Sequence, residues 1–216
     1  LDRLGYRVKA VSSRMRDSAH SLASRIAGCQ EYESLQHTVD TSDIVFITTS
    51  DDVIPKVINS VKWRKCSGVV HCSGALSTNV MDPAKAQQSY VGAFHPFQTF
   101  PSLESALRNL PGTTFGIEGD LPLEAFLKDL AFNLNGFPIL LKAGDKELYH
   151  ISAVTVCAFV LGLVDQASAL WQKLGIRKDT AIRAMLPIMA GMVNGLESEG
   201  IPHALTGPYE RGDIET

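Results

Sequence analysis

A lysine and a histidine lie four residues apart in the stretch KELYHISAV, as Lys146 and His150. Residues at positions i and i+4 share one face of a helix, so these side chains would point in the same direction. Asp145 is the expected N-cap, which places Lys146 at the positive end of the helix dipole. That field lowers the pKa of an ammonium group and helps proton transfer near neutral pH. The pair is a candidate for acid–base catalysis, with a solvated helix start and a core histidine as the alternative.

Small polar residues follow three expected strands, at the edge where parallel α/β sheets bind ligands. After residues 7–11, two serines and an arginine stand where an acidic residue would select NAD, and they suit the extra phosphate of NADP. Hydroxyl side chains follow residues 44–48, and a glycine that permits close backbone approach follows residues 68–71. Polar turns and helix caps are the alternatives. The predicted dinucleotide contacts are Ser12, Ser13, Arg14, Thr48, Thr49, Ser50, Ser73 and Gly74.

Further polar residues could contact a substrate. In GAFHPFQTFPS, a histidine and a glutamine follow an expected strand, in a loop that Pro96 would stiffen. The C-terminal ALTGPYERGD carries an arginine that would suit a carboxylate, although an Arg–Asp pair holding the loop is the alternative. The predicted substrate contacts are His95, Gln98, Asn194, Thr206 and Arg211.

The composition is that of a soluble globular protein, with 45% hydrophobic and 20% charged residues. A net charge of −3 gives no indication of nucleic acid or an anionic membrane as a partner. The four cysteines lack CxxC or zinc-finger spacing, which predicts reduced thiols in a cytosol. The apolar run from Ala153 ends before Asp165, short of the roughly 20 residues of a membrane span, so we expect neither a span nor a signal peptide.

Strand-like and helix-like segments alternate up to about residue 142, which predicts an α/β fold with an open, mainly parallel, doubly wound sheet. The run at 44–48 reads as the most buried strand. No glycine-rich GxGxxG turn is found, and LDRLGY reads as a helix end, so we expect a first strand and glycine loop of roughly 20–25 residues upstream. Strands are expected at 7–11, 44–48, 68–71, 91–94, 114–117 and 138–141, and helices at 18–28, 53–61 and 122–134.

After residue 143 the pattern becomes helical. One helix is expected at residues 145–174 and a second at 179–196, with a bend near Pro187. Residues 151–164 are apolar almost all round, which predicts burial on most sides. The expected domains are therefore a nucleotide-binding domain at 1–143 and a helical domain at 144–216, the first lacking its N-terminal part and the second cut short.

Six motifs occur in order along the chain: HCSGAL, HPFQTFPS, GTTFGIEGD, KELYHISAV, LPIMAGMVNGL and ALTGPYERGD. This ordered set resembles bacterial Rossmann-like proteins with a helical C-terminal domain of unknown function. These are related to NADP-dependent oxidoreductases of the pyrroline-5-carboxylate reductase and 6-phosphogluconate dehydrogenase type. The resemblance covers nearly the whole chain. It implies a Rossmann-type NADP domain, an all-α domain like the C-terminal domain of 6-phosphogluconate dehydrogenase, and a homodimer formed through the helical domain.

The resemblance also implies roles for the opening pair. In the related β-hydroxyacid dehydrogenases, the helix after the cofactor domain opens with a lysine that acts as general acid/base, followed four residues later by an asparagine. Lys146 and His150 match that spacing, with histidine in place of asparagine, and histidine can also shuttle protons. Ala158 stands where family members tend to have a further asparagine.

We therefore predict a cytoplasmic NADP(H)-dependent oxidoreductase that transfers hydride to or from a small carbonyl, imine or hydroxy substrate, with Lys146 and His150 as catalytic residues. The first alternative is a non-catalytic protein that binds or senses a dinucleotide, which the histidine and alanine replacements favour.

Two further hypotheses use other residues. A metal-dependent hydrolase could use His71, His95 and His150, but these histidines lack ligand-like spacing, and we predict no metal. Cys72 could be a nucleophile, but no base is assigned beside it.

Overall fold

The computed structural model of the chain describes residues 1–204, 207 and 212. The chain divides into two compact units, Leu1–Ala153 and Val154–Thr216. The division falls at the end of helix α7 (Asp145–Val154), later than the boundary expected at residue 143. The first turns of α7 belong to the first unit because their side chains pack on its sheet, as described below.

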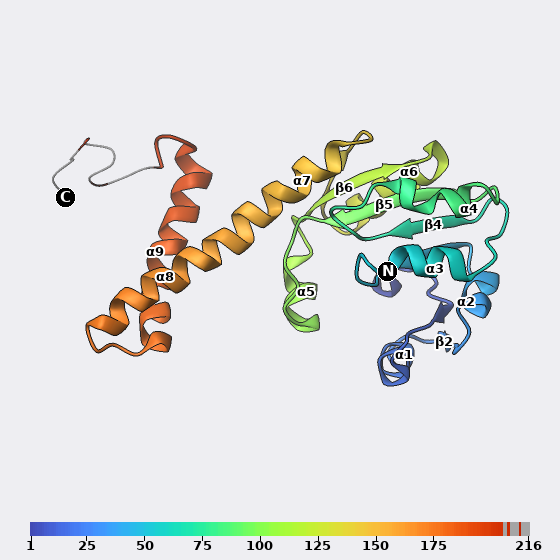
Figure 1. Cartoon of the computed structure of the whole chain (residues 1–216), viewed down its shortest axis with the longest axis horizontal. Coiled ribbons are helices and arrows are strands. Elements are labelled where there is room, and N and C mark those ends of the chain that lie inside the picture. Colours follow the sequence, from blue (N-terminus) through green and yellow to red (C-terminus); the bar gives the residue numbers. More distant parts are fainter. Residues whose placement is uncertain (205–206, 208–211, 213–216) are drawn as a thin grey trace. The chain divides into compact units, whose positions relative to one another are not determined.

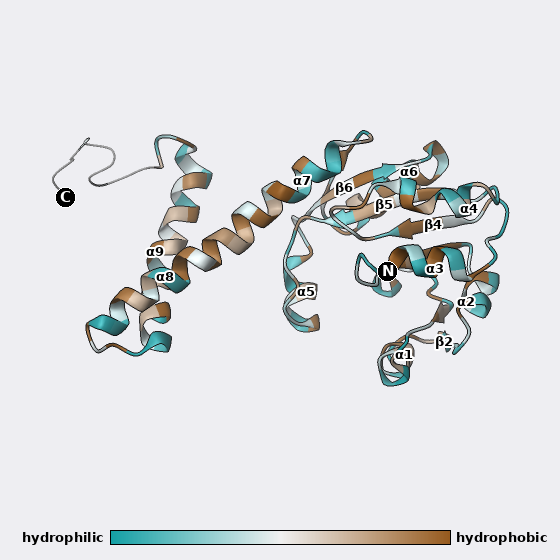
Figure 2. Ribbon diagram, viewed as in Figure 1, coloured by the Kyte–Doolittle hydropathy of each residue, from teal (hydrophilic) through white to brown (hydrophobic). Residues whose placement is uncertain are grey.

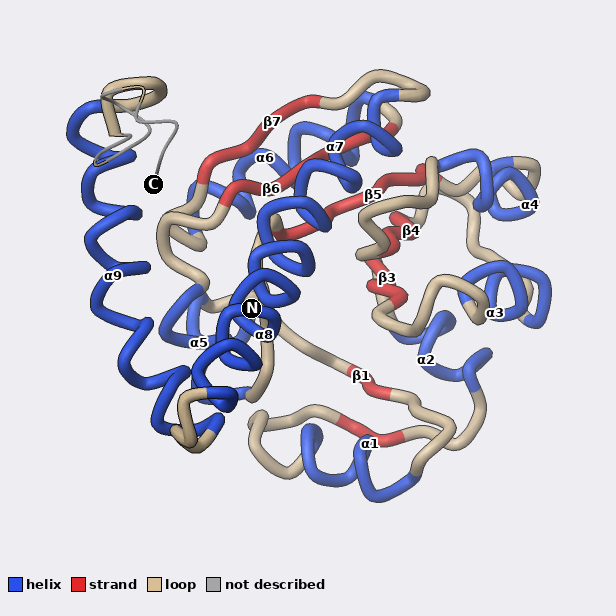
Figure 3. The backbone as a smooth tube through the Cα atoms, turned by 60° about the vertical axis from the view of Figure 1, so that its left-hand side comes forward, coloured by secondary structure: helices blue, strands red, loops and turns tan. Residues whose placement is uncertain are grey.

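A five-stranded sheet of order β3-β4-β5-β6-β7 forms the centre of the first unit, and Figure 3 shows these strands side by side. Strands β3, β4 and β5 are parallel, β6 is antiparallel to β5, and β7 is parallel to β6. Two short strands, β1 and β2, pair in parallel as a separate sheet. The strands are β1 (Ala10–Val11), β2 (Gln30–Glu31), β3 (Ile44–Ile47), β4 (Gly68–His71), β5 (Tyr90–Pro96), β6 (Thr114–Gly119) and β7 (Phe137–Leu140).

Helices connect and cover these strands, which confirms the expected α/β fold with a mainly parallel sheet (Figure 1). The exception is the antiparallel β5–β6 pair, beyond which β6 and β7 both run opposite to β3, β4 and β5. Neither Ser50 nor Asp51 caps the helix after β3, α3 (Ile54–Ser60), which begins after Val53 without a side-chain cap. The helices are η1 (Asp2–Leu4), α1 (Arg16–Ala23), α2 (Leu35–Thr41), α3 (Ile54–Ser60), η2 (Thr78–Met81), α4 (Asp82–Lys85), α5 (Leu103–Asn109), α6 (Leu121–Asn133) and α7.

Successive side chains along a strand point to opposite faces, so the sheet has two separate cores. On one face, which we call the η2 face, Val69 and Val91 pack in one buried cluster with residues of α3, η2 and α4. On the other, the α6 face, Phe94 and Phe115 stack at 4.5 Å and pack with leucines of α6. The polar side chains of the candidate site lie on the η2 face, near the carboxyl ends of β4 and β5.

The most buried strand is β4 rather than β3, contrary to the expectation from the sequence. All four residues of β4 are buried, whereas Ile47 alone is buried in β3. In the described chain β3 pairs with one neighbour, β4, so it lies at the edge of the five-stranded sheet. An apolar run indicates that the faces of a strand are buried, but it does not determine which strands pair with it.

The second unit consists of the π-helical turn η3 (Thr155–Phe159), α8 (Val160–Lys173) and α9 (Lys178–Glu199), as far as the structure describes it. Gly175 adopts a positive φ of 78° at the turn between α8 and α9. An ion pair of 2.5 Å between Asp165 and Lys178 joins the two helices. Both expected helices are confirmed, and Pro187 lies inside the second.

The expected burial of residues 151–164 is not found among residues 1–204, 207 and 212. Val156, Phe159 and Leu163 are 62–69% exposed, and Figure 2 shows hydrophobic residues along α8. The continuous helical segment Asp145–Lys173 is long and apolar enough to cross a membrane by length and composition. The sequence pattern correctly indicated an apolar surface, but the described residues do not cover it.

Candidate functional site

Lys146 is buried at the carboxyl end of β4. The residue is 1% exposed, and its Nζ atom donates a hydrogen bond of 2.6 Å to the carbonyl oxygen of Ser73. Burial lowers the pKa of Lys146 from 10.5 to about 8, and the nearby Glu118 opposes this shift. Desolvation therefore has the effect on the amine that the helix dipole was expected to have. Asp145 is the first helical residue, and its Oδ2 accepts a hydrogen bond from the backbone N–H of Lys142.

Tyr149, one turn along α7, joins this helix to β5. Its hydroxyl donates to the carbonyl oxygen of His95 at 3.2 Å and lies 3.3 Å from Nδ1 of the same residue. Because the Tyr149 hydroxyl donates its proton to the carbonyl oxygen, we assign Nδ1 of His95 as the donor to the tyrosine oxygen. Nε2 of His95 is then an acceptor. A Cβ on Gly116 of β6 would lie 2.8 Å from the tyrosine ring, so this glycine makes room for it.

Burial keeps this pair of side chains neutral near pH 7. It lowers the pKa of His95 to about 4 and raises the pKa of Tyr149 to about 12. Tyr149 was not assigned from the sequence, although it lies between the lysine and the histidine of the opening pair. It positions His95, which belongs to β5 itself rather than to the loop after it.

The imidazoles of His95 and His150 converge on Gly74. Their ring centroids are 6.0 Å apart. A Cβ on Gly74 would lie 2.7 Å from Nε2 of His95 and would clash with Nδ1 of His150. The glycine was expected to admit a cofactor, but here the space it leaves is taken by the two rings. Nδ1 of His150 is buried and has no hydrogen-bond partner in the described part of the chain.

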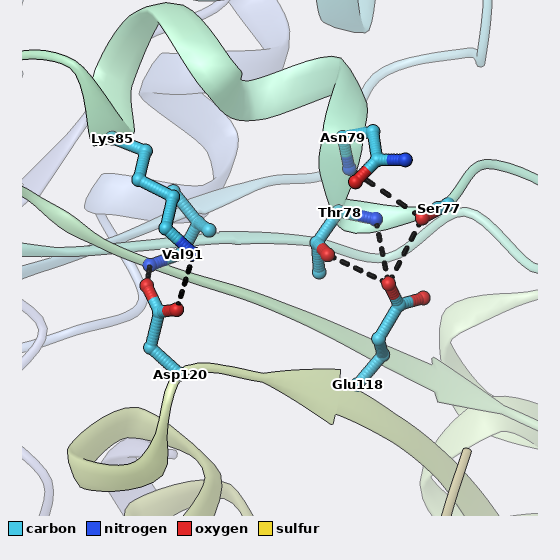
Figure 4. Close-up of polar contacts among 7 residues, drawn as sticks. All are labelled: Ser77, Thr78, Asn79, Lys85, Val91, Glu118 and Asp120. Atoms are coloured by element: carbon cyan, nitrogen blue, oxygen red, sulfur yellow. Dashed lines mark hydrogen bonds and ion pairs between the residues drawn. The ribbon is translucent and has the colours of Figure 1, made fainter. Parts of the chain in front are cut away.

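A buried carboxylate, Glu118 of β6, lies on the same face of the sheet and was also not assigned from the sequence. Its Oε1 atom accepts hydrogen bonds from the hydroxyl of Ser77 and from the backbone and hydroxyl of Thr78 (Figure 4). The sequence does contain a signal for Glu118, because it is the one charged residue in the otherwise uncharged strand TFGIEG. A buried charge in such a strand is rare unless it is paired.

The predicted dinucleotide contacts lie at the carboxyl ends of β1, β3 and β4. Arg14 and residues 48–50 are exposed. A hydrogen bond from Ser50 lowers the pKa of Asp52, with smaller effects of the Lys56 and Arg14 charges in the same direction. Arg14 makes no hydrogen bond or ion pair with any residue that the structure describes, which leaves its donors free.

Two serines of the set, Ser13 and Ser73, accept hydrogen bonds from nearby backbone. Ser13 accepts a hydrogen bond from the backbone of Met15, and the hydroxyl of Ser73 accepts from the backbone of Ala75 and Leu76. Ser12 is half-buried, and Ser73 and Gly74 are buried. The exposed members of the set are therefore better placed to meet a ligand from solution.

The predicted substrate contacts do not all gather at this edge. Gln98 is exposed and bonds to the backbone of Asn109 and Thr99 rather than pointing to His95. Asn194 lies on α9 in the second unit. Thr206 and Arg211 lie outside the described residues.

The two other chemical hypotheses find little support. Burial raises the pKa of Cys72 to about 11, so its thiol stays protonated and is a poor nucleophile near neutral pH. Among residues 1–204, 207 and 212, no three histidine, cysteine or acidic side chains are grouped so that they could hold a metal ion. Two surface hollows of the first unit, lined among others by Arg64 and by Lys65, lie at the amino ends of β4 and β5.

Comparisons with known proteins agree with this architecture. Residues 113–216 match the family model described as "Domain of unknown function (DUF2520)". No curated protein matches the chain. Protein TM1727 from Thermotoga maritima is 27% identical with a TM-score of 0.73, over 94% of this chain and 76% of that one.

Two further solved structures share the fold at lower identity. BF3122 from Bacteroides fragilis, described as a proposed NADP oxidoreductase, is 23% identical with a TM-score of 0.74, over 98% of this chain and 79% of that one. The 1-pyrroline-5-carboxylate reductase of Streptococcus pyogenes is 14% identical with a TM-score of 0.67, over 96% and 75%. The chain therefore has a Rossmann-like fold followed by a helical C-terminal part, as the motifs predicted.

Proposed function

We propose that this protein is an NADP(H)-dependent oxidoreductase that acts on a small carbonyl, imine or hydroxy compound. The observation that carries the proposal is the position of Lys146, a buried amine with a pKa of about 8 at the carboxyl end of a parallel strand. That edge is where Rossmann-like sheets bind their ligands. The fold shared with BF3122 and with the pyrroline-5-carboxylate reductase supports the same class.

The residues at this edge fit an NADP cofactor. Arg14 follows β1, is exposed and has its guanidinium donors free, so it would bind the 2′-phosphate through two parallel hydrogen bonds. The exposed hydroxyls of Thr48, Thr49 and Ser50 would contact the rest of the dinucleotide after β3. When bound, NADP(H) supplies or accepts the hydride, and the protein orients the reactants.

The buried amine would supply the matching proton. A pKa of about 8 leaves Lys146 mainly protonated at pH 7 and still able to release the proton, which is the range suited to general acid–base catalysis. The Ser73 carbonyl holds the amine in place. The neutral His95 presents Nε2 at Gly74 as an acceptor to which a substrate hydroxyl could donate, and His150 faces the same glycine.

The alternative function is a protein that binds the dinucleotide without turning over a substrate. His150 stands where the related dehydrogenases have an asparagine, and its buried Nδ1 has no partner among the described residues. A sensor would keep the fold and the phosphate contact of Arg14 while the amine of Lys146 served only to hold the Ser73 loop.

One experiment separates the two functions. The protein is incubated with NADPH and a panel of oxo acids, aldehydes and cyclic imines, and oxidation of NADPH is followed for the wild type, Lys146→Met and Lys142→Met. We expect Lys146→Met to lose about 10²- to 10⁴-fold in turnover, the usual contribution of a general acid, with NADPH affinity retained. The exposed Lys142 is the matched control. NADPH binding without turnover of any panel member by the wild type would favour the sensor.

We further infer that the protein is soluble and cytoplasmic and that its helical unit pairs with a second copy of the chain. Large apolar side chains of α8 and α9, such as Leu163 and Ile188, are 69% and 74% exposed, more apolar surface than a monomer usually leaves uncovered. The length of Asp145–Lys173 would also permit a membrane span. The ion pair of Asp165 with Lys178 favours the dimer, because a charge within a lipid-facing helix is costly.

A further inference from the structure

Glu118 and Lys146 are the buried charged residues of the described chain, one acidic and one basic. Glu118 is 7% exposed and Lys146 is 1% exposed. Isolated charges are rarely buried, because their desolvation costs far more than a protein usually recovers. The presence of one buried charge of each sign on neighbouring elements therefore suggests that they balance each other.

Only one of the two carboxylate oxygens of Glu118 accepts hydrogen bonds from the described residues. Its Oε1 atom accepts the hydrogen bonds from Ser77 and Thr78 seen in Figure 4, which hold the side chain over the η2 face. Its Oε2 atom is buried and has no hydrogen-bond partner among the described residues. A structural cap for η2 requires Oε1 alone, so the cap does not account for the second oxygen.

His71 of β4 lies on the same row of the sheet. The strand register pairs His71 with Ala93 of β5 and pairs Ala93 with Glu118 of β6. Residues that are directly opposite point to the same face, so the imidazole and the carboxylate flank the methyl group of Ala93. Alanine is the smallest side chain that can stand between them, and a larger residue would fill the space above it.

The free atoms of His71 and Glu118 are complementary. Nδ1 of His71 accepts a hydrogen bond of 3.2 Å from the backbone N–H of Ser73, so the proton of the neutral imidazole is on Nε2. Nε2 is buried and, like Oε2 of Glu118, makes no hydrogen bond of standard geometry in the described chain, although the backbone of Ser77 lies close enough to raise the pKa of His71. A donor and an acceptor thus remain on either side of Ala93.

Ser73 connects this row to Lys146. Its N–H donates to His71, and its carbonyl accepts from the amine of Lys146. Burial lowers the pKa of His71 to about 4, and the ammonium of Lys146 acts in the same direction, while the Ser77 backbone and, less strongly, Glu118 act against it. Both charges therefore act on one neutral imidazole.

We propose that Glu118 is the buried counter-charge of Lys146, which holds that amine in its ammonium form, with the neutral His71 and the Ser73 peptide between the two charges. Glu118 is thus a positioning residue, because it acts through its neighbours. The pairing of charges rests on the sheet register and the burial, and its value for proton transfer rests on the proposed function.

The other groups that face Lys146 cannot replace Glu118. The thiol of Cys72 stays protonated, and His95 stays neutral, so neither supplies a negative charge near pH 7. His150, one turn further along α7, is not acidic. Asp51 raises the pKa of Lys146 less than Glu118 does, and its exposed carboxylate is screened by solvent.

The test measures the charge of Lys146 directly. The protein is labelled with ¹⁵Nζ-lysine, and the Lys146 resonance, assigned by its loss in Lys146→Met, is titrated by NMR without cofactor or substrate. Glu118→Gln keeps an oxygen for Ser77 and Thr78 and removes only the charge. We expect it to lower the titration midpoint of Lys146 by roughly one pH unit, since one unit corresponds to the energy of a modest charge interaction.

Asp120→Asn is the matched control. Asp120 follows β6, and its carboxylate binds the backbone of Val91 and the amine of Lys85, as Figure 4 shows. We expect no change in the Lys146 midpoint, and Glu118→Asp, which keeps the charge, should restore most of the wild-type value. An unchanged midpoint in Glu118→Gln, or an equal shift in Asp120→Asn, would overturn the proposal.

If Glu118→Gln does not fold, a second measurement tests whether Lys146 and His71 face each other, as the proposed arrangement requires. In Lys146→Met, the C2–H resonance of His71 should titrate above the value of about 4, because the ammonium that lowers the pKa of His71 is gone. An unmoved His71 midpoint would show that the two residues do not face each other. Both titrations are read without NADPH, so a protein that fails to oxidise NADPH can still pass or fail this test.

Discussion

The amine of Lys146 donates a hydrogen bond of 2.6 Å to the carbonyl oxygen of Ser73, although 73 residues separate the two along the chain. This bond ties the first turn of α7 to the loop after β4. Lys146 is buried at the carboxyl end of the strand, and this burial lowers its pKa to about 8. The relationship leads to predictions about stability as well as about catalysis.

The first prediction concerns the pH dependence of stability. The pKa of Lys146 is about 8 in the folded protein and 10.5 for the free side chain, so between these values the unfolded chain binds more protons. The contribution of Lys146 to the free energy of unfolding therefore rises with pH from about 8 to about 10.5. Urea unfolding at several pH values should show the difference between wild type and Lys146→Met rising in this window.

The comparison with a variant is needed because other groups act oppositely. Burial raises the pKa values of Cys72 and Tyr149, so their contributions fall as pH rises. The Tyr149 contribution cancels between wild type and Lys146→Met, and the Cys72 contribution cancels apart from the smaller effect of the Lys146 charge on its pKa. Lys142→Met, at an exposed position, should give a flat difference. A flat or falling difference for Lys146→Met would contradict the prediction.

The second prediction concerns Gly74. A Cβ at this position meets the rings of both His95 and His150, so Gly74→Ala forces the imidazoles apart. Overpacking of this kind typically costs about 1–3 kcal/mol, which chemical denaturation would measure. Gly191→Ala is the control, since a Cβ there has nothing within 4 Å and the helix should gain up to about 1 kcal/mol. Equal stability of Gly74→Ala and wild type would show that the rings do not converge there.

The third prediction concerns the choice of cofactor. Loss of the Arg14 guanidinium should weaken NADPH binding by about 10- to 100-fold, the value of charge-assisted hydrogen bonds of about 1.5–3 kcal/mol, and leave NADH binding unchanged. Calorimetric titration of Arg14→Ala with both dinucleotides measures this. Arg16→Ala is the control, because Arg16 already pairs with Glu33 at 3.0 Å. A parallel loss of affinity for NADPH and NADH would assign the 2′-phosphate contact elsewhere.

The fourth prediction concerns the apolar surface of the helical unit. An aspartate in place of Leu163, which is 69% exposed, should split the dimer into folded monomers because a buried interface cannot accommodate an unpaired carboxylate. Sedimentation velocity would measure the change in mass. Leu121→Asp on α6 is the control, since Leu121 is 80% exposed in the first unit. A wild-type protein that sediments as a monomer at micromolar concentration would contradict the prediction.

Much of the architecture could be predicted from the sequence alone. The run at 68–71 matches β4 residue by residue, and the expected helix at 122–134 is shifted by one residue from α6. These elements were readable because hydrophobic periodicity and glycine, proline and cap signals act locally. The short elements β2 and α2 were not predicted, because their few residues show no clear hydrophobic periodicity.

The candidate site likewise has one part that the sequence predicted and another that only the structure revealed. The sequence by itself identified Lys146 and His150 as a pair on one helical face, and it marked the loops after β1, β3 and β4 as ligand-binding candidates. Only the tertiary structure decided that Lys146 is buried against Ser73 and that Glu118 lies on the row of His71. These relationships depend on strand order, register and burial, which bring distant residues together and which no local pattern of residues encodes.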